Sequence, residues 1–410
     1  MSAKTRLGIM MFLQYAIWGA WAPVLSVYLL DDLGFSGFQA GAIYALLPLA
    51  TILSPFIGGQ LADRYFSSEK VIAFLQTTGG VLLILCAQAT SFTTMAWLMF
   101  VYCLLYAPTL ALTNSVAMIN LKDSEKEFGA IRVWGTIGWI AAGLMLSGWR
   151  TVGGGGESVG GGGAVMMGGD MLFLAGVFSI AMGLQALMLP RTPPSKEGVK
   201  PWAFLESLKM LKAKQFAIFV AITFVVSTEL EFFYILTAPF LQSDAIGVSS
   251  ANLPAVMTIA QFAEIFVMAF GLSWALKRYG MRKTLAIGVV AWPIRYVIFA
   301  IGGPAWLVIA SLALHGFCYV FFFVAAFIYV DKVAPPDIRA SAQSMIAIVA
   351  LGLGRFLGSL FAGKIQEIFT TDLGTNWTGV FLVPCALTML CAVAFLVFFR
   401  DEEGAQPVAA

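Results

Sequence analysis

The sequence predicts an all-α membrane protein in which twelve transmembrane helices form two six-helix bundles. Three observations support this prediction: recurrent long apolar segments, basic residues confined to alternate loops, and a weak repeat between the two halves. Of the 410 residues, 60% are hydrophobic and 11% are charged, and the mean hydropathy is +0.88. Soluble globular proteins carry about twice that share of charged residues, so the composition excludes a soluble globule.

The apolar segments are each long enough to cross a hydrocarbon core about 30 Å thick as a helix. No small-residue cleavage site follows the first of them, which predicts a retained helix rather than a signal peptide. The predicted spans are approximately residues 8–30, 38–61, 71–90, 94–118, 131–149, 171–190, 215–240, 252–276, 284–302, 304–330, 341–363 and 377–399.

The distribution of basic residues predicts the orientation in the membrane. If the N-terminus is cytoplasmic, 20 of the 24 Lys and Arg residues fall in the termini and loops of that side. The opposite loops contain only Arg150 and Lys364, while Arg295 and Arg355 lie within spans. Because cytoplasmic loops carry the excess of Lys and Arg, both termini are predicted to be cytoplasmic.

Two inner loops occupy corresponding places in the two halves. Residues 59–65 include an Asp-Arg pair, and the loop at residues 273–283 follows six spans later. Ile131-Arg132, at the start of span five, recurs as Ile338-Arg339 before span eleven. Two parallel six-span halves are typical of a secondary transporter of the major facilitator type, and the first loop resembles that superfamily's signature. We expect these loops to gate the cytoplasmic side through Asp63, Arg64, Arg278 and Arg339.

The repeat also predicts the domain boundaries. Residues 1–190 and 215–400 form the two bundles, residues 191–214 link them, and residues 401–410 form a cytoplasmic tail. Within the linker, apolar residues recur at helical spacing, which predicts an amphipathic helix on the inner leaflet. These apolar residues are Trp202, Leu205, Leu208 and Leu211.

One acidic residue stands out in span eight. Glu264 lies in an apolar run from Leu253 to Leu276 that contains no other charge. An ionised carboxylate near a bilayer centre costs several kcal/mol unless it is paired, protonated or facing water. Gln261 lies three residues earlier and therefore on the same helical face. We expect this face to line the functional site.

Three other spans carry polar residues on single helical faces. Arg132, Thr136 and Trp139 share a face of span five, and Glu231 and Tyr234 share a face of span seven. Gln14 and Trp18 lie one turn apart in span one. For any single residue the alternative role is a helix–helix hydrogen bond, and for Arg132 it is an anchor at the inner surface. Together the residues predict a cavity suited to flat rings with a polyhydroxylated arm.

Other function classes lack the residues that they need. The five cysteines are scattered through apolar spans without ligand spacing, and His315 is the single histidine. A metal site, a nucleophile–base pair and hence an enzyme are therefore not predicted. No cofactor is expected, and a net charge of +2 gives no indication of a nucleic-acid partner. A sensor usually needs an added soluble domain, whereas the longest predicted inner segment spans only residues 191–214.

Several motifs resemble the bacterial nucleoside/proton symporter family of the major facilitator superfamily. The resemblance covers essentially the whole chain apart from a glycine-rich insert at residues 153–169. By this resemblance, Arg132, Thr136, Gln261 and Glu264 match positions that contact or support a bound nucleoside. The motifs are Phe12-Leu13-Gln14 with Trp18-Gly19, Tyr106-Ala107-Pro108-Thr109, residues 131–138 and residues 338–343.

The chain also departs from the pattern of that family. The family has amides at the positions of Glu231 and Tyr234, and an aspartate in span ten where this chain has Val320. Trp139 stands where the family can have a phenylalanine, so a ring is kept. The resemblance implies a proton-coupled nucleoside importer, in which we expect Glu231 and Glu264 to share the proton. The alternative is a facilitator or uniporter for another polar solute, such as a sugar or glycoside. We expect a monomer in either case.

Overall fold

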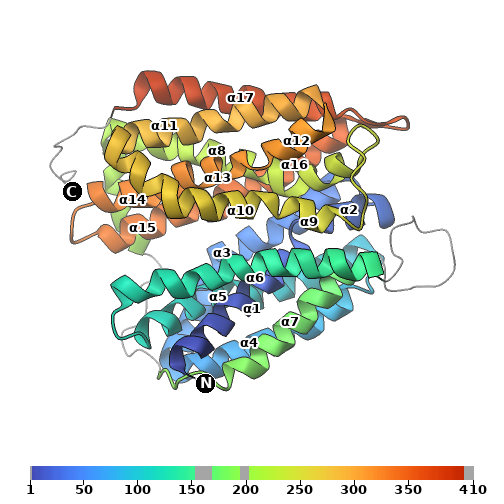
Figure 1. Ribbon diagram of the computed structural model, residues 1–410. Helices are drawn as coiled ribbons and strands as arrows, with labels where there is room; N and C mark the ends of the chain where they lie inside the picture. Colours follow the sequence, from blue (N-terminus) through green and yellow to red (C-terminus); the bar gives the residue numbers. More distant parts are fainter. Residues whose placement is uncertain (1, 153–168, 194–202, 401–410) are drawn as a thin grey trace. The chain divides into compact units, whose positions relative to one another are not determined.

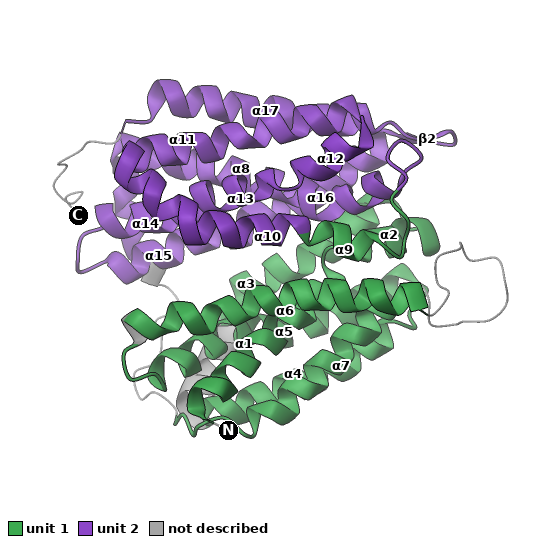
Figure 2. Cartoon of the chain, viewed as in Figure 1, with its two compact units in different colours: residues 1–199, 248–258 green, residues 200–247, 259–410 purple. Residues whose placement is uncertain are grey.

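The computed structural model describes residues 2–152, 169–193 and 203–400, apart from the side chains of residues 55–65, 124–125 and 203–204. The predicted tail, Trp202 and the side chains of Asp63 and Arg64 therefore lie outside the described part. The chain divides into two compact units (Figure 2). Unit 1 consists of Met1–Val199 with Val248–Thr258, and unit 2 consists of Lys200–Gly247 with Ile259–Ala410.

Both units are built from helices, and the predicted all-α class is confirmed. The elements of unit 1 are α1 (Ala3–Trp21), α2 (Leu25–Val27), η1 (Tyr28–Asp32), α3 (Gly37–Tyr65), α4 (Ser68–Cys86), α5 (Phe92–Ile119), α6 (Ser124–Val152), α7 (Asp170–Ala186) and α9 (Leu253–Met257). Those of unit 2 are η2 (Ala203–Lys212), α8 (Lys214–Gln242), α10 (Ile259–Phe266), η3 (Val267–Gly271), α11 (Leu272–Ile301), α12 (Ala305–Ser311), α13 (Leu314–Cys318), η4 (Tyr319–Val324), α14 (Ala325–Val333), α15 (Arg339–Ala347), η5 (Ile348–Leu353), α16 (Gly354–Ile368) and α17 (Trp377–Phe398). A two-stranded hairpin, β1 (Thr370–Thr371) and β2 (Gly374–Thr375), joins α16 to α17.

Ten helical segments of the described chain are long and apolar enough to cross a membrane. One of them, Leu253–Ile301, has 49 residues and is interrupted at Gly280, where φ is 75° and ψ is 176°. The apolar helix α7 has 17 residues and is slightly shorter than the rest. Large apolar side chains such as Phe74, Trp97 and Leu390 are about two-thirds exposed, which is typical of a lipid-facing surface.

Small residues allow the helices within each unit to approach closely. A Cβ atom on Gly80 of α4 would lie 2.7 Å from the carbonyl oxygen of Gly176 on α7. In unit 2, a Cβ atom on Gly358 of α16 would lie 2.4 Å from the carbonyl oxygen of Thr228 on α8. Such contacts are typical of membrane helices, where close packing replaces the hydrophobic effect as the source of association. In unit 2, α11 also packs along α17 (Figure 1).

The linker contains a short helix with one exposed apolar face. In η2, a 3₁₀ helix, Leu205, Leu208 and Leu211 are each 37–46% exposed. A 3₁₀ helix has three residues per turn, so leucines at every third position line up on one side. Met210 and Ser207 are buried instead, and the Ser207 hydroxyl donates to the carbonyl oxygen of Ser341 in α15. Contact between this leucine face of η2 and the membrane surface stays a prediction.

Candidate functional site

The predicted site residues of unit 1 include an aromatic pair between α1 and α6. The rings of Trp18 and Trp139 meet edge to face, with their centroids 5.3 Å apart. Gly19 makes this approach possible, because a Cβ atom there would lie 2.7 Å from the Trp139 Cα atom. Trp139 is 8% exposed and Trp18 is half-buried. The pair gives α1 and α6 a shared ring surface.

Arg132 and Thr136 precede Trp139 on α6. The Arg132 guanidinium lies over the ring of Tyr15, with its Cζ atom 3.9 Å from the ring centroid. Both Arg132 and Thr136 are half-buried. A guanidinium on an aromatic face is held by a cation–π interaction and keeps its hydrogen-bond donors for other groups. This half of the site thus combines a cation, a hydroxyl and rings.

Gln14 has a different setting, because its side chain is fully buried inside unit 1. Its Nε2 atom donates to Thr109 Oγ1, and its Oε1 atom accepts from Gln76 Nε2, both at 2.9 Å. Gln76 also donates to Thr109, and Ser179 Oγ lies 2.7 Å from Gln76 Oε1. The network joins α1, α4, α5 and α7. In this structure Gln14 thus makes the helix–helix hydrogen bonds that were the alternative to solute contact.

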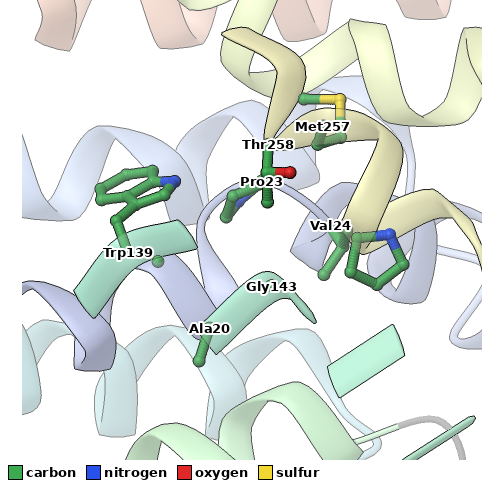
Figure 3. A pocket seen from close by; sticks show the side chains of 9 residues that line it. Ala20, Pro23, Val24, Trp139, Gly143, Met257 and Thr258 are labelled. Carbon is green, nitrogen blue, oxygen red and sulfur yellow. The ribbon is translucent and has the colours of Figure 1, made fainter. Parts of the chain in front are cut away.

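A small apolar pocket lies beside the aromatic pair (Figure 3). Trp139 and Gly143 of α6 line one side, and Met257 and Thr258 at the end of α9 line another. Docking of α9 requires Gly143, since a Cβ atom there would lie 2.8 Å from Thr258 Cγ2. The remaining lining residues are Gly19, Ala20, Pro23, Val24 and Pro254. The pocket is lined almost entirely by apolar groups, so it offers packing contacts rather than polar recognition.

The site residues of unit 2 centre on an ion pair. The Arg355 guanidinium on α16 donates through Nε to the Glu231 carboxylate on α8. Ser359, one turn after Arg355, donates to the second carboxylate oxygen at 3.0 Å. The two side chains are 12% and 1% exposed. Glu231 is therefore compensated at both oxygens in this structure.

Tyr234 connects this pair to the acidic residue of α10. The Arg355 Cζ atom lies 5.1 Å from the Tyr234 ring centroid. The Tyr234 hydroxyl is also within electrostatic range of the Glu231 and Glu264 carboxylates. Glu264 is half-buried, and Gln261 on the same helix is 6% exposed with no hydrogen-bond partner for its Oε1 atom in the described structure. Within unit 2 the structure thus brings together Glu231, Tyr234 and Glu264.

Three π-helical turns flank these residues. η3 begins three residues after Glu264, η4 contains Val320, and η5 ends two residues before Arg355. Such turns reorient the side chains that follow and are frequent at functional sites. Val320 is fully buried, so the position where the family has an aspartate holds a packed apolar side chain here.

The predicted gating residues are only partly described. Arg278 of α11 is exposed. Arg339 at the start of α15 lies 3.7 Å from Asp331 of α14, and both side chains are about half exposed. In the part of the chain with described side chains, no group of three or more potential metal ligands is found.

Arg355 and Ser359 were not assigned to the site from the sequence. Arg355 was recognised as a cation within an apolar span, which is a signal of function, but nothing in the sequence says which acid it faces. Gln76 was missed entirely, because one amide in an apolar helix has many possible partners.

Comparison with known proteins defines the family. The family profile described as nucleoside H⁺ symporter matches residues 1–404. The chain belongs to this family. YegT of Escherichia coli (strain K12), whose name gives it as a candidate nucleoside transporter, is 36% identical over 98% of this chain and 95% of its own length. The nucleoside permease NupG of the same organism is 30% identical over 99% of this chain and 98% of its own length. Two crystal structures of NupG superpose with TM-scores of 0.87 and 0.85 at 28% identity, covering 97% and 98% of this chain and 100% of theirs.

Membership confirms three predictions from the sequence. The resemblance to nucleoside/proton symporters is correct. The protein is a nucleoside transporter of the membrane and not an enzyme. The helical architecture is that of the NupG structures. The roles of individual residues in this symporter stay predictions.

Proposed function

We propose that the protein imports nucleosides together with protons across the bacterial inner membrane by alternating access. The match of the family profile to residues 1–404 is the observation that supports this most strongly. In this proposal the two units are the two six-helix halves of a twelve-span major facilitator fold, with both termini cytoplasmic. The interruption at Gly280 then separates spans eight and nine, and α7 is span six.

This proposal assigns solute contacts to side chains within each unit. Trp18 and Trp139 stack on the base, while Arg132 and Thr136 donate hydrogen bonds. Tyr234, Gln261 and Glu264 contact the polar arm of the nucleoside. The buried Gln261 Oε1 atom, which has no partner in the described structure, is a natural acceptor for a ribose hydroxyl, because buried acceptors are costly to leave unpaired. Gln14 supports Trp18 from the core of unit 1.

Coupling in this proposal uses the two carboxylates around Tyr234. Glu264 accepts the proton more readily, because Glu231 is already compensated by Arg355 and Ser359. Protonation of Glu231 requires Arg355 to leave it, so Glu231 responds when α8 and α16 move apart. One proton crossing about 100 mV supplies roughly 2.3 kcal/mol, which sustains about a fiftyfold solute gradient.

The proposal also assigns a gating role to Asp63, Arg64, Arg278 and Arg339. In this role they make contacts that differ between the two states of the transporter, since a shift between two states needs such a difference. The exposed Arg339–Asp331 pair is weak enough to be exchanged during such a motion.

A binding panel tests the function and its alternative. Purified protein should be stabilised against thermal unfolding by nucleosides and not by sugars or glycosides, because a ligand of the native state raises the unfolding temperature. Thr136→Val should weaken nucleoside binding about tenfold by removing one hydrogen bond. Thr151→Val on the same helix is the matched control and should bind normally, since Thr151 donates to Ser147 at the exposed end of α6. Stabilisation by sugars alone would assign the protein to another polar solute.

A further inference from the structure

Unit 2 contains a second buried acid on α8, two residues before Glu231. The side chain of Glu229 is fully buried. Among the described residues, its Oε2 atom has no hydrogen-bond partner, and its Oε1 atom lies 3.0 Å from Thr228 Oγ1. None of the ion pairs in this part of the chain includes Glu229. The described residues thus supply a cation for Glu231 and not for Glu229.

Thr228 gives the Glu229 carboxyl group only a shared hydrogen bond. The Thr228 hydroxyl lies 2.7 Å from the carbonyl oxygen of Val225 and 3.0 Å from Glu229 Oε1. Because a hydroxyl has one proton, this donor is divided between the two acceptors. A shared neutral donor does little to compensate an ionised carboxylate in a buried setting.

The groups around Glu229 agree with a neutral state. On α17 the Cys391 thiol is within electrostatic range of Glu229 and brings no positive charge. On α16 Arg355 is engaged with Glu231. On α11 the Tyr296 hydroxyl donates to the carbonyl oxygen of Glu229. An ionised carboxylate in such a setting costs several kcal/mol when no cation neutralises it.

Helix α11 contains a buried cation that likewise lacks a partner of opposite charge among the described residues. Arg295 is fully buried and has no carboxylate partner among the described ion pairs. Its Cζ atom lies 4.4 Å from the ring centroid of Phe233 and 4.6 Å from that of Trp292. Its Nη1 atom lies 3.3 Å from His315 Nδ1, and its Nε atom has no hydrogen-bond partner in the described part of the chain. Arginine keeps its proton even when buried, so a cation without an anion persists here.

Arg295 and Glu229 are linked through a single hydroxyl group. Arg295 Nη2 donates at 3.5 Å to the Tyr296 hydroxyl, and this hydroxyl donates to the Glu229 carbonyl oxygen. Tyr296 thus connects α11 to the backbone of α8 at Glu229. A direct pair between the two side chains requires α11 to move against α8 so that these contacts are exchanged.

We propose that Glu229 is a proton-binding site of the transport cycle and that Arg295 is the cation that neutralises it after deprotonation. The O–H bond of the acid breaks, the proton passes to water on the cytoplasmic side, and the carboxylate pairs with the Arg295 guanidinium. Proton uptake from the outside restores the neutral acid and releases Arg295. The inference deepens the proposed proton coupling and rests on it for the role in transport, though not for the protonation of Glu229.

Infrared spectroscopy tests the protonated acid directly, without substrate. The full-length protein in lipid nanodiscs should show a C=O stretching band of a protonated carboxyl that shifts in heavy water. Glu229→Gln should remove one component of this band, and Glu229→Asp should shift it. Glu231→Gln is the matched control on the same helix and should leave that component unchanged, because Glu231 is ion-paired. An unchanged band in Glu229→Gln overturns the proposal.

Uptake into proteoliposomes tests the role in coupling. If one proton is carried with each solute, the wild-type protein should accumulate nucleoside up to about fiftyfold under an imposed membrane potential of about 100 mV. Glu229→Gln should reduce accumulation to near onefold and keep counterflow exchange within about threefold, because the amide mimics the neutral acid. Full accumulation by Glu229→Gln refutes the coupling role. Absence of nucleoside uptake by the wild type refutes the proposed function instead, and the infrared result still decides whether Glu229 is protonated.

Discussion

Arg355 on α16 and Glu231 on α8 form an ion pair inside unit 2, although 124 positions separate them in the sequence. Gly358 and Thr228 bring the two helices close enough for this contact. Both side chains are almost fully buried, so water cannot replace either partner. A buried ion pair of this kind is costly to break from one side only.

Loss of Arg355 should therefore destabilise the protein strongly. We expect Arg355→Gln to lower the free energy of unfolding by about 3–5 kcal/mol, because it leaves the Glu231 carboxylate buried and uncompensated. The double variant Glu231→Gln/Arg355→Gln should recover most of this loss. Equilibrium unfolding in detergent measures the effect. Lys364→Gln is the control, since it breaks an exposed pair with Glu367 that contributes at most about 1 kcal/mol. Equal losses of stability in Arg355→Gln and Lys364→Gln would contradict the prediction.

The buried amide network of unit 1 gives a second test of stability. Ser179→Ala removes the hydroxyl that lies 2.7 Å from both the carbonyl and the Oε1 atoms of Gln76. We expect a loss of about 1–3 kcal/mol, because a polar atom of Gln76 loses a partner away from water. Thermal unfolding monitored by intrinsic fluorescence measures it. Ser344→Ala, whose hydroxyl donates to Ala340 at an exposed site, should change stability by less than about 0.5 kcal/mol.

The close approach of α4 and α7 predicts a steric effect. Gly80→Ala places a Cβ atom 2.7 Å from the Gly176 carbonyl oxygen, and backbone cannot yield without moving the helix. A loss of about 1–3 kcal/mol is expected. Gly148→Ala on α6, where a Cβ atom would meet nothing within 4 Å, should be neutral or slightly stabilising. If the two variants unfold at the same temperature, the helices are not packed as described.

Removal of the acid at Glu264 should uncouple transport. In proteoliposomes, uptake should follow an imposed inside-alkaline pH step, and Glu264→Gln should abolish this response by removing a titrating group. Glu367→Gln is the control, because Glu367 lies in an exposed pair, and it should respond as the wild type does. If wild-type uptake ignores both the pH step and a protonophore, the protein is a uniporter, and Val320 in place of the family's aspartate is the reason to examine first.

The loops that are predicted to be cytoplasmic should affect the rate of transport rather than solute affinity. We expect Asp63→Asn to slow uptake several-fold at saturating nucleoside while the binding constant stays within about twofold, since a gate acts on the equilibrium between states. Lys122→Gln, in another loop predicted to lie on that side, is the control and should leave both quantities unchanged. Weakened binding with a normal exchange rate would argue against a gating role.

The helices were largely predictable from the sequence. The predicted span at residues 215–240 differs from α8 (Lys214–Gln242) by two residues or fewer at each end. The predicted ranges for α5 and α17 fit equally well. The bilayer imposes one minimum length on every span, so apolar length is read directly from the chain. Apolar length alone is not sufficient at two places. Helix α7 has only 17 residues, and the 49-residue segment Leu253–Ile301 is divided only by the interruption at Gly280.

The partners of the polar residues were not predictable in the same way. Gln14 and Glu231 were both expected to face a solute, and both are instead engaged by side chains far away in the sequence. Helical spacing tells which residues share a face but not which helix that face meets. Any of several neighbouring helices could have supplied the partner.

The sequence by itself determined the class of the protein, its family, and the residues able to carry charge inside the membrane. Those properties depend on composition and local order along the chain. Only the tertiary structure decided that Glu231 is neutralised by Arg355, whereas Glu229 and Arg295 lack partners of opposite charge among the described residues. The physical reason is that the cost of a buried charge depends on distances of a few ångströms between different helices, which close packing at glycines such as Gly358 sets.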